Sequence, residues 1–241
     1  MDTEKLSKLG IYYAILPFKR NQDVVKIQEI NSSLAISVTD GFHHQDKIPG
    51  DKEGRAAADF IADNFPKYFS KLSNIKDYQN RANKAAQITD TELIKLFPEY
   101  VSGVGAFIIE NKKNNIVIAT DSIFVYLFSN GRWYKPKEIM THYLDSKIYV
   151  NDCSRFFGHG NLKKPGQTLY QVKTDVIIIP VSQPIILVTD GTDGLLSVDD
   201  LNQINKKNSV NDPEKFFKEI KKLIESRKSN QNDDASILLK I

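Results

Sequence analysis

The sequence predicts an α+β protein in which two antiparallel β-sheets stack face to face between outer helices, a four-layer α-β-β-α sandwich. The order of segments indicates this: strands, two long helices, more strands, two further helices and a closing strand. Turn signals such as Asn31-Ser32 and Asn130-Gly131 join neighbouring strands, which favours antiparallel pairing. With 241 residues, 41% of them hydrophobic, we expect one domain over residues 1–241.

The first three strands lie close together in the chain. Residues 11–16 are rich in β-branched and aromatic side chains and end before Pro17. Residues 24–30 alternate between apolar and polar, which is typical of a half-buried strand. Residues 33–39 are more continuously apolar and end on Asp40-Gly41, so we expect a buried strand that stops there.

Two long helices should follow. The first opens with Asp51 as its N-cap, and Pro66 is expected to kink or restart it. The second has apolar residues at helical spacing from Tyr78 and ends before Pro98.

Strands then resume over residues 104–109, 116–120 and 123–128. Residues 136–168 show weak periodicity and are interpreted as an irregular insertion or flap. We expect residues 172–179 and 185–189 to pair with each other around the turn at 180–184.

The C-terminal part should contain two helices and the closing strand. One helix starts at Ser197, and the next at Asp212-Pro213, an N-cap followed by proline at the first helical position. Residues 235–241 form the last predicted strand.

Composition argues against nucleic-acid-binding, membrane and secreted proteins. A net charge of +3 does not favour binding to nucleic acid or to a membrane surface, and the lysines between 206 and 228 are typical of a solvated helix face. The single cysteine, Cys153, allows no internal disulfide and favours a reducing, cytoplasmic compartment. The first apolar run, residues 11–18, is too short for a membrane span and precedes its basic residues, unlike a signal peptide.

Three acidic positions follow or precede predicted core strands. Val38-Thr39-Asp40-Gly41 and Val188-Thr189-Asp190-Gly191 share one pattern, and Asp233-Asp234 precedes the closing strand. Carboxylates that meet at strand ends form the hard oxygen site that Mg²⁺ or Mn²⁺ prefers. A single Asp-Gly is more often a hairpin turn than a ligand, so the hypothesis depends on the whole set.

Other phosphatase and cofactor patterns fit poorly. The haloacid-dehalogenase motif needs a nucleophilic Asp at the position that Val188 occupies, and Cys153 lacks the arginine of a cysteine phosphatase. The glycines of Ser102-Gly103-Val104-Gly105-Ala106 lead into a strand, which favours sheet packing over dinucleotide binding.

Six short motifs follow one another along the chain: Arg20-Asn21-Gln22-Asp23, Val38-Thr39-Asp40-Gly41, Gly54-Arg55-Ala56-Ala57-Ala58, Ala119-Thr120-Asp121-Ser122, Leu187-Val188-Thr189-Asp190-Gly191 and Asp233-Asp234-Ala235-Ser236. In this order they resemble the motifs of the metal-dependent Ser/Thr protein phosphatases of type 2C, in their compact bacterial form. The resemblance covers almost the whole chain.

The resemblance implies a ligand set for two ions, Mn²⁺ or Mg²⁺. Asp40, Asp190 and Asp233 would hold one ion. Asp40, the carbonyl of Gly41 and an acid at or next to Asp23 would hold the other. A water activated by the two metals would then hydrolyse phosphoserine or phosphothreonine in proteins.

The resemblance also implies two further roles. Asp121 would contribute to a weaker third metal site, and Arg20 would clamp the phosphate oxygens with its planar fork. The expected partner is a phosphoprotein substrate, so the enzyme would counter a Ser/Thr kinase, and the expected state is a monomer.

A second hypothesis stays open. Gln22 stands where many members of the family have Glu, and Thr120 and Ile123 replace a Gly and an Arg. These departures favour a catalytically weak pseudophosphatase that acts as a regulatory or binding module. The retained Asp40, Asp190 and Asp233 favour the active enzyme.

Overall fold

We describe the fold from a computed structural model, which describes residues 3–16, 22–43, 52–97, 101–120, 123–139, 157–158, 172–192, 195–227 and 234–241. Its elements in chain order are α1 (Thr3–Lys8), β1 (Ile11–Leu16), β2 (Val24–Ile30), β3 (Ser33–His43), α2 (Lys52–Lys71), α3 (Tyr78–Leu96), β4 (Val101–Glu110), β5 (Asn114–Ala119), β6 (Ile123–Ser129), β7 (Arg132–Tyr134), β8 (Asp175–Pro180), β9 (Ile185–Thr189), the 3-10 turn η3 (Asp190–Thr192), α4 (Val198–Lys207), α5 (Pro213–Arg227) and β10 (Ala235–Lys240).

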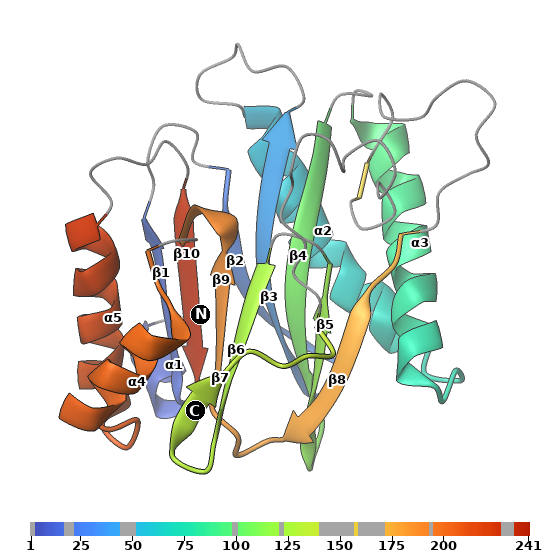
Figure 1. The fold of residues 1–241 in the computed structure, drawn as a ribbon. Helices are drawn as coiled ribbons and strands as arrows, with labels where there is room; N and C mark the ends of the chain where they lie inside the picture. The colour runs from blue at the N-terminus through green and yellow to red at the C-terminus, as the bar shows by residue number, and fades with distance from the viewer. Residues whose placement is uncertain are drawn as a thin grey trace.

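The described strands form two antiparallel five-stranded sheets, so the predicted fold class is confirmed. The first sheet has the order β1-β10-β9-β6-β7 and the second the order β2-β3-β4-β5-β8. Figure 1 shows α4 and α5 on the outer side of the first sheet and α2 and α3 on the outer side of the second. The layers therefore run helix, sheet, sheet, helix.

Three apolar cores separate the four layers. The inner core lies between the two sheets and includes Ile36, Val38, Val117, Leu187 and Leu238. A second core joins the first sheet to α4 and α5, and a third joins the second sheet to α2 and α3. Because both faces of each sheet are covered, the central strands read as nearly continuous apolar runs rather than as alternating ones.

Local turn and cap signals predict the element ends well. Asn31, Ser32 and Asn130 adopt positive φ in the hairpin turns between β2 and β3 and between β6 and β7. Ser197 caps α4 through a capping box with Asp200. Asp51 lies outside the described residues.

Two helical features differ from the expectation. The helix α2 is continuous through Pro66, so the predicted restart is wrong. The short helix α1 was not predicted from the polar N-terminal residues, and its Leu6 is buried in the inner core. Among the described helices, none has the length and apolarity needed to cross a bilayer.

The first Asp-Gly motif does not end its strand, which corrects the expectation for residues 33–39. Strand β3 continues through Asp40 and Gly41 to His43, because β4 supplies partners for these residues from Val104 back to Val101. A side chain on Gly41 would overlap the main-chain carbonyl of Gly54 in α2. The glycine therefore serves close helix–sheet packing rather than a turn.

The predicted pairing of residues 172–179 with 185–189 is wrong. Strand β8 pairs with β5 in the second sheet, whereas β9 lies between β10 and β6 in the first. The turn at 181–184 thus crosses from one sheet to the other. Turn chemistry alone cannot distinguish a hairpin from such a crossing, because both need a short polar bend.

The predicted insertion at 136–168 falls mostly outside the described residues. Its described part includes Phe157, which exchanges both main-chain hydrogen bonds with Gly103 of β4. The next amide, that of Gly158, donates to buried Asp90 at 2.7 Å, and Ser102 donates to the Gly158 carbonyl at 3.0 Å. This part of the insertion is thus attached to β4 at the residue that pairs with Gly41.

The outer helices α4 and α5 are joined at one end by an ion pair. Arg227 binds both carboxylate oxygens of Asp200, at 2.7 and 2.9 Å. The guanidinium of Arg227 is the main cause that lowers the pKa of Asp200 from 3.8 to about 2, and Ser197 adds to the effect. The pair also places opposite charges at the favourable ends of the two helix dipoles.

This ion pair should make a pH-dependent contribution to stability. Asp200→Asn keeps an acceptor for Ser197 but loses the charge that faces Arg227, so at pH 7 we expect a loss of about 1–2 kcal/mol. Because the folded pKa is depressed, the stabilisation is complete above the ordinary value of 3.8 and is lost as the pH falls towards 2.

Urea unfolding of wild type and Asp200→Asn between pH 7 and pH 3 measures this contribution. The difference in unfolding free energy should be roughly halved at pH 3. Glu225→Gln, which breaks an exposed pair with Lys221, is the matched control and should change stability by less than about 0.5 kcal/mol. An Asp200→Asn difference that stays constant across this range contradicts the expectation.

Candidate functional site

Four chain segments meet at one edge of the two sheets. In Figure 1, β9 ends and β10 begins at the upper edge, towards which β3 also points. In the second sheet Val24 pairs with Thr39 in antiparallel register. Asp23, which precedes Val24, therefore lies across from Asp40, which follows Thr39. In the first sheet Val188 pairs with Ile237, so Asp190 and Asp234 stand at the same end of their strands.

The Asp23 carboxylate lies at the centre of this meeting point. Only 1% of the residue is exposed, and its Oδ2 accepts a hydrogen bond from the Thr189 hydroxyl at 2.7 Å. The same Thr189 oxygen accepts the main-chain N–H of Ser236 at 2.9 Å. One hydroxyl therefore connects the start of β2, in the second sheet, to β9 and β10 in the first.

Like charges surround Asp23. Burial raises the pKa of the Asp23 carboxyl to about 7, the Thr189 hydrogen bond opposes that rise, and the charge of Asp234 adds to it. The Asp40 carboxyl lies against the Asp23 side chain. Three acids from separate parts of the sequence thus interact at this edge, and the Asp40 contact, unlike the charge of Asp234, lowers the Asp23 pKa.

Asp234 is held in place by the main chain on two sides. Its Oδ2 accepts the amide N–H of Gln22 at 2.5 Å. Its carbonyl lies so close to Gly191 that any side chain at residue 191 would overlap it. The second Asp-Gly motif and the acidic pair before β10 are therefore in direct contact.

Sequence reasoning did not assign a role to Thr39, Thr189 or Arg55. Thr39 donates to the Ala58 carbonyl of α2 at 3.0 Å, and Arg55 donates to the Asp23 carbonyl at 3.1 Å. The signal for the two threonines was present, because each precedes Asp-Gly in the repeated Val-Thr-Asp-Gly. Arg55 carries no comparable signal in the sequence.

The structure describes only part of the predicted site. Asp23, Asp40, Gly41 and Asp190 are described, whereas Arg20, Asp121 and Asp233 lie outside the described residues. Asp23 and Asp40 lie together, and Asp190 directly follows Thr189, which binds Asp23. Within the described ranges, no group of three or more His, Cys, Asp or Glu side chains has the arrangement of a metal site.

The chemistry of the donors that do meet suits a hard divalent cation. They are carboxylates and main-chain carbonyls, without a His or Cys side chain among the four predicted ligands that are described. The Ser236 hydroxyl is buried next to them and opposes the rise in the Asp23 pKa. An oxygen-rich, negatively charged edge fits Mg²⁺ or Mn²⁺ with bound water better than a soft metal.

The Thr189 hydroxyl should be essential for joining the sheets at this edge. Thr189→Val leaves the buried Ser236 amide and the Asp23 carboxylate each short of a partner, so we expect a loss of about 3 kcal/mol in unfolding free energy. Thr189→Ser keeps the hydroxyl and should lose only about 1 kcal/mol. Denaturant unfolding of both variants tests this, and equal losses contradict the role of the hydroxyl.

Gly191 should tolerate no side chain. In Gly191→Ala the new methyl group meets the main-chain carbonyl of Asp234, which cannot rotate away, so we expect a loss of about 3 kcal/mol. Gly131→Ala is the control, because it has open space and should lose only about 1 kcal/mol through its positive φ. Thermal unfolding compares the two, and a smaller loss at Gly191 than at Gly131 contradicts the close contact.

Comparisons with known proteins give a fold-level match. No family model matches the chain, and no curated protein matches it in sequence. Among solved structures, a serine/threonine phosphatase from Staphylococcus aureus is similar, with a TM-score of 0.69 and 12% identity over 96% of this chain and 94% of that chain. A serine/threonine phosphatase from S. agalactiae matches with a TM-score of 0.65 and 14% identity, over 95% and 98% of the two chains.

A third similar structure carries the family name. It is a serine-threonine phosphatase 2C from Toxoplasma gondii, with a TM-score of 0.66 and 14% identity over 95% of this chain and 94% of that chain. The match spans nearly the full length of both proteins. The resemblance inferred from the six motifs is confirmed, and the chain has the fold of the type 2C serine/threonine phosphatases.

Proposed function

We propose that this protein is a metal-dependent phosphatase that hydrolyses phosphoserine or phosphothreonine in proteins. The observation that carries the proposal is the meeting of Asp23, Asp40, Asp234 and the Asp190 turn at one sheet edge, on a type 2C fold. The substrate would be a phosphoprotein produced by a Ser/Thr kinase.

The proposed ligands are the acids that the motifs identify. Asp40, Asp190 and Asp233 would hold one Mn²⁺ or Mg²⁺, and Asp40, the Gly41 carbonyl and Asp23 would contribute to the second. Two such cations, when bound, supply an acidified water and neutralise the phosphate charge. Asp121 would serve a weaker third site.

The chain's own residues would orient the substrate and the ligands. Arg20 precedes Asp23 by three residues, and its planar guanidinium suits two phosphate oxygens at once. Thr189 holds Asp23, so this carboxylate needs little reorganisation when a cation binds, and the Gln22 amide holds Asp234, which directly follows the proposed ligand Asp233. Such fixed orientation is what second-layer hydrogen bonds supply at metal sites.

One observation favours the second candidate, a pseudophosphatase that binds phosphoproteins without turnover. Gln22 is 97% buried at the meeting point, where an acid would add a ligand charge. A neutral side chain at residue 22 leaves the predicted metal ligands with less negative charge to bind a second ion.

Hydrolysis and metal affinity together test the proposal. With millimolar Mn²⁺, the wild type should hydrolyse phosphoserine or phosphothreonine peptides, and Asp40→Asn and Asp190→Asn should each lose on the order of 10²-fold or more in kcat/KM. Calorimetric titration should show weaker Mn²⁺ binding in both variants.

Asp77→Asn is the matched control. Asp77 caps α3 and asparagine caps equally well, so activity and metal affinity should not change. Mn²⁺ binding without turnover on any of several phosphopeptides would overturn the enzymatic proposal in favour of the binding module. The absence of Mn²⁺ binding and turnover would overturn the enzymatic proposal, and a failure to bind any of the phosphopeptides would overturn the binding module as well.

A further inference from the structure

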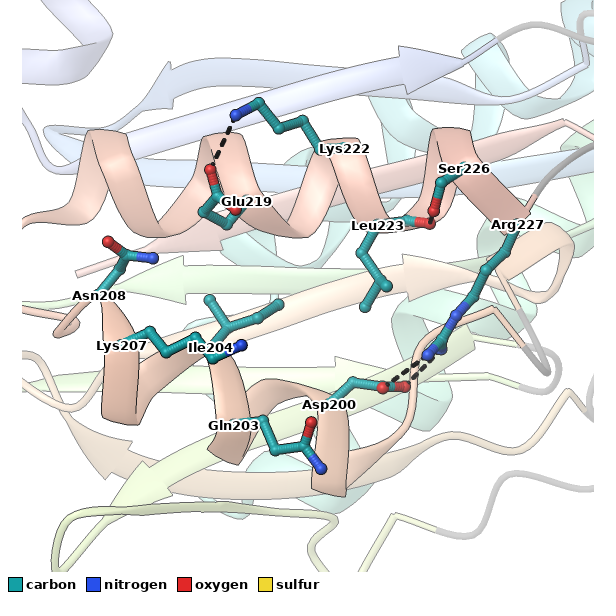
Figure 2. Close-up of a pocket in the computed structure, with 10 residues that line it drawn as sticks. All are labelled: Asp200, Gln203, Ile204, Lys207, Asn208, Glu219, Lys222, Leu223, Ser226 and Arg227. Carbon is teal, nitrogen blue, oxygen red and sulfur yellow. Dashed lines mark hydrogen bonds and ion pairs between the residues drawn. The ribbon is translucent and has the colours of Figure 1, made fainter.

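A groove of about 400 Å³ lies between the outer helices α4 and α5. Figure 2 shows the residues that line it, with Ile204 and Leu223 between the helices. Two charged pairs lie along it. Glu219 and Lys222 pair within α5, whereas Arg227 crosses from the end of α5 to Asp200 at the start of α4.

Arg227 does more than pair with Asp200. While both of its terminal nitrogens bind the Asp200 carboxylate, Nη1 also donates to the main-chain carbonyl of Leu195 at 3.0 Å. A guanidinium can make these three bonds at once because its donors lie in a rigid plane. Lysine, with a single ammonium, cannot reproduce that geometry.

The Leu195 carbonyl belongs to the segment that follows the second Asp-Gly motif. The Leu195 amide donates to the Thr192 carbonyl at 2.9 Å, and the Thr192 hydroxyl donates to the Thr189 carbonyl at 2.6 Å. Asp190 lies between these two threonines, in the turn η3. Tyr126 donates to the next carbonyl, that of Leu196, at 3.0 Å and fixes the same segment from β6.

We propose that Arg227 is a positioning residue for Asp190: its bond to the Leu195 carbonyl holds the turn that presents the second Asp-Gly motif to the metal. The inference rests on the proposed function. It extends the site from the sheet edge to the outer helix α5, because a continuous series of hydrogen bonds joins the Arg227 guanidinium to both residues that flank Asp190-Gly191.

Two variants separate this role from the ion pair. Arg227→Met removes both the pair and the Leu195 bond, whereas Asp200→Asn removes the charge pair and leaves the Leu195 bond. We expect Arg227→Met to weaken Mn²⁺ binding by about 10-fold, the lower end of the effect of second-layer residues, and Asp200→Asn to weaken it by less than about 3-fold. Arg227→Lys should fall between wild type and Arg227→Met.

Lys222→Met is the matched control in the same groove. It breaks the pair with Glu219 and leaves the Arg227 bond to the Leu195 carbonyl in place, so Mn²⁺ affinity should equal that of wild type. Calorimetric titration of the full chain measures the affinities. Hydrogen exchange of the metal-free protein gives a readout independent of activity, because exchange of the Leu195 amide should be faster in Arg227→Met and unchanged in Lys222→Met.

The outcomes distinguish this inference from the proposed function. If wild type binds Mn²⁺, and Arg227→Met and Arg227→Lys bind it as tightly as wild type does, the positioning role is wrong and the proposed function stands. If Asp200→Asn weakens binding as much as Arg227→Met, the ion pair and not the Leu195 bond acts, which also overturns the inference. If wild type binds no Mn²⁺, the proposed function itself has failed. Should Arg227→Met not fold, Arg227→Lys and Asp200→Asn provide the same comparison.

Discussion

The candidate site depends on one buried contact, the hydrogen bond from the Thr189 hydroxyl to the Asp23 carboxylate. An acid excluded from water is unfavourable unless its oxygens find donors, and here the donor comes from the opposite sheet. The contact therefore couples the site to the fold, because the stacking of the two sheets brings Asp23 and Thr189 together. Ser236 joins them through its amide, so three strand ends share one hydroxyl oxygen.

A second group of hydrogen bonds supports the site from outside the sheets. Glycines at 41 and 191 let a helix and a strand approach the two Asp-Gly motifs closely, and Arg227 holds the segment after the second. The acids are thus fixed by the buried Thr189 hydroxyl and by main-chain contacts. Such an arrangement keeps repelling carboxylates close together without a large rearrangement, which is the condition that a preorganised cation site requires.

Sequence patterns predicted most elements because strands and helices leave local signals, such as the hairpin at Asn130-Gly131 and the N-cap at Ser197. They failed where partners are distant. The crossing of residues 181–184 between sheets and the continuation of β3 past Asp40 both depend on which strand lies alongside. Asp23 was assigned as a ligand, yet its burial and its bond to Thr189, 166 residues away, cannot be inferred from neighbouring residues.

The position of β10 has a consequence for biosynthesis. This strand lies between β1 and β9, although more than 200 residues separate it from β1. On the ribosome, β1 and β9 emerge before their shared neighbour, so the apolar middle of the first sheet has an open edge until β10 is translated. Pairings of such long range form slowly, and an uncovered strand edge invites association with other chains. Chaperone protection of the nascent chain would matter most during this interval.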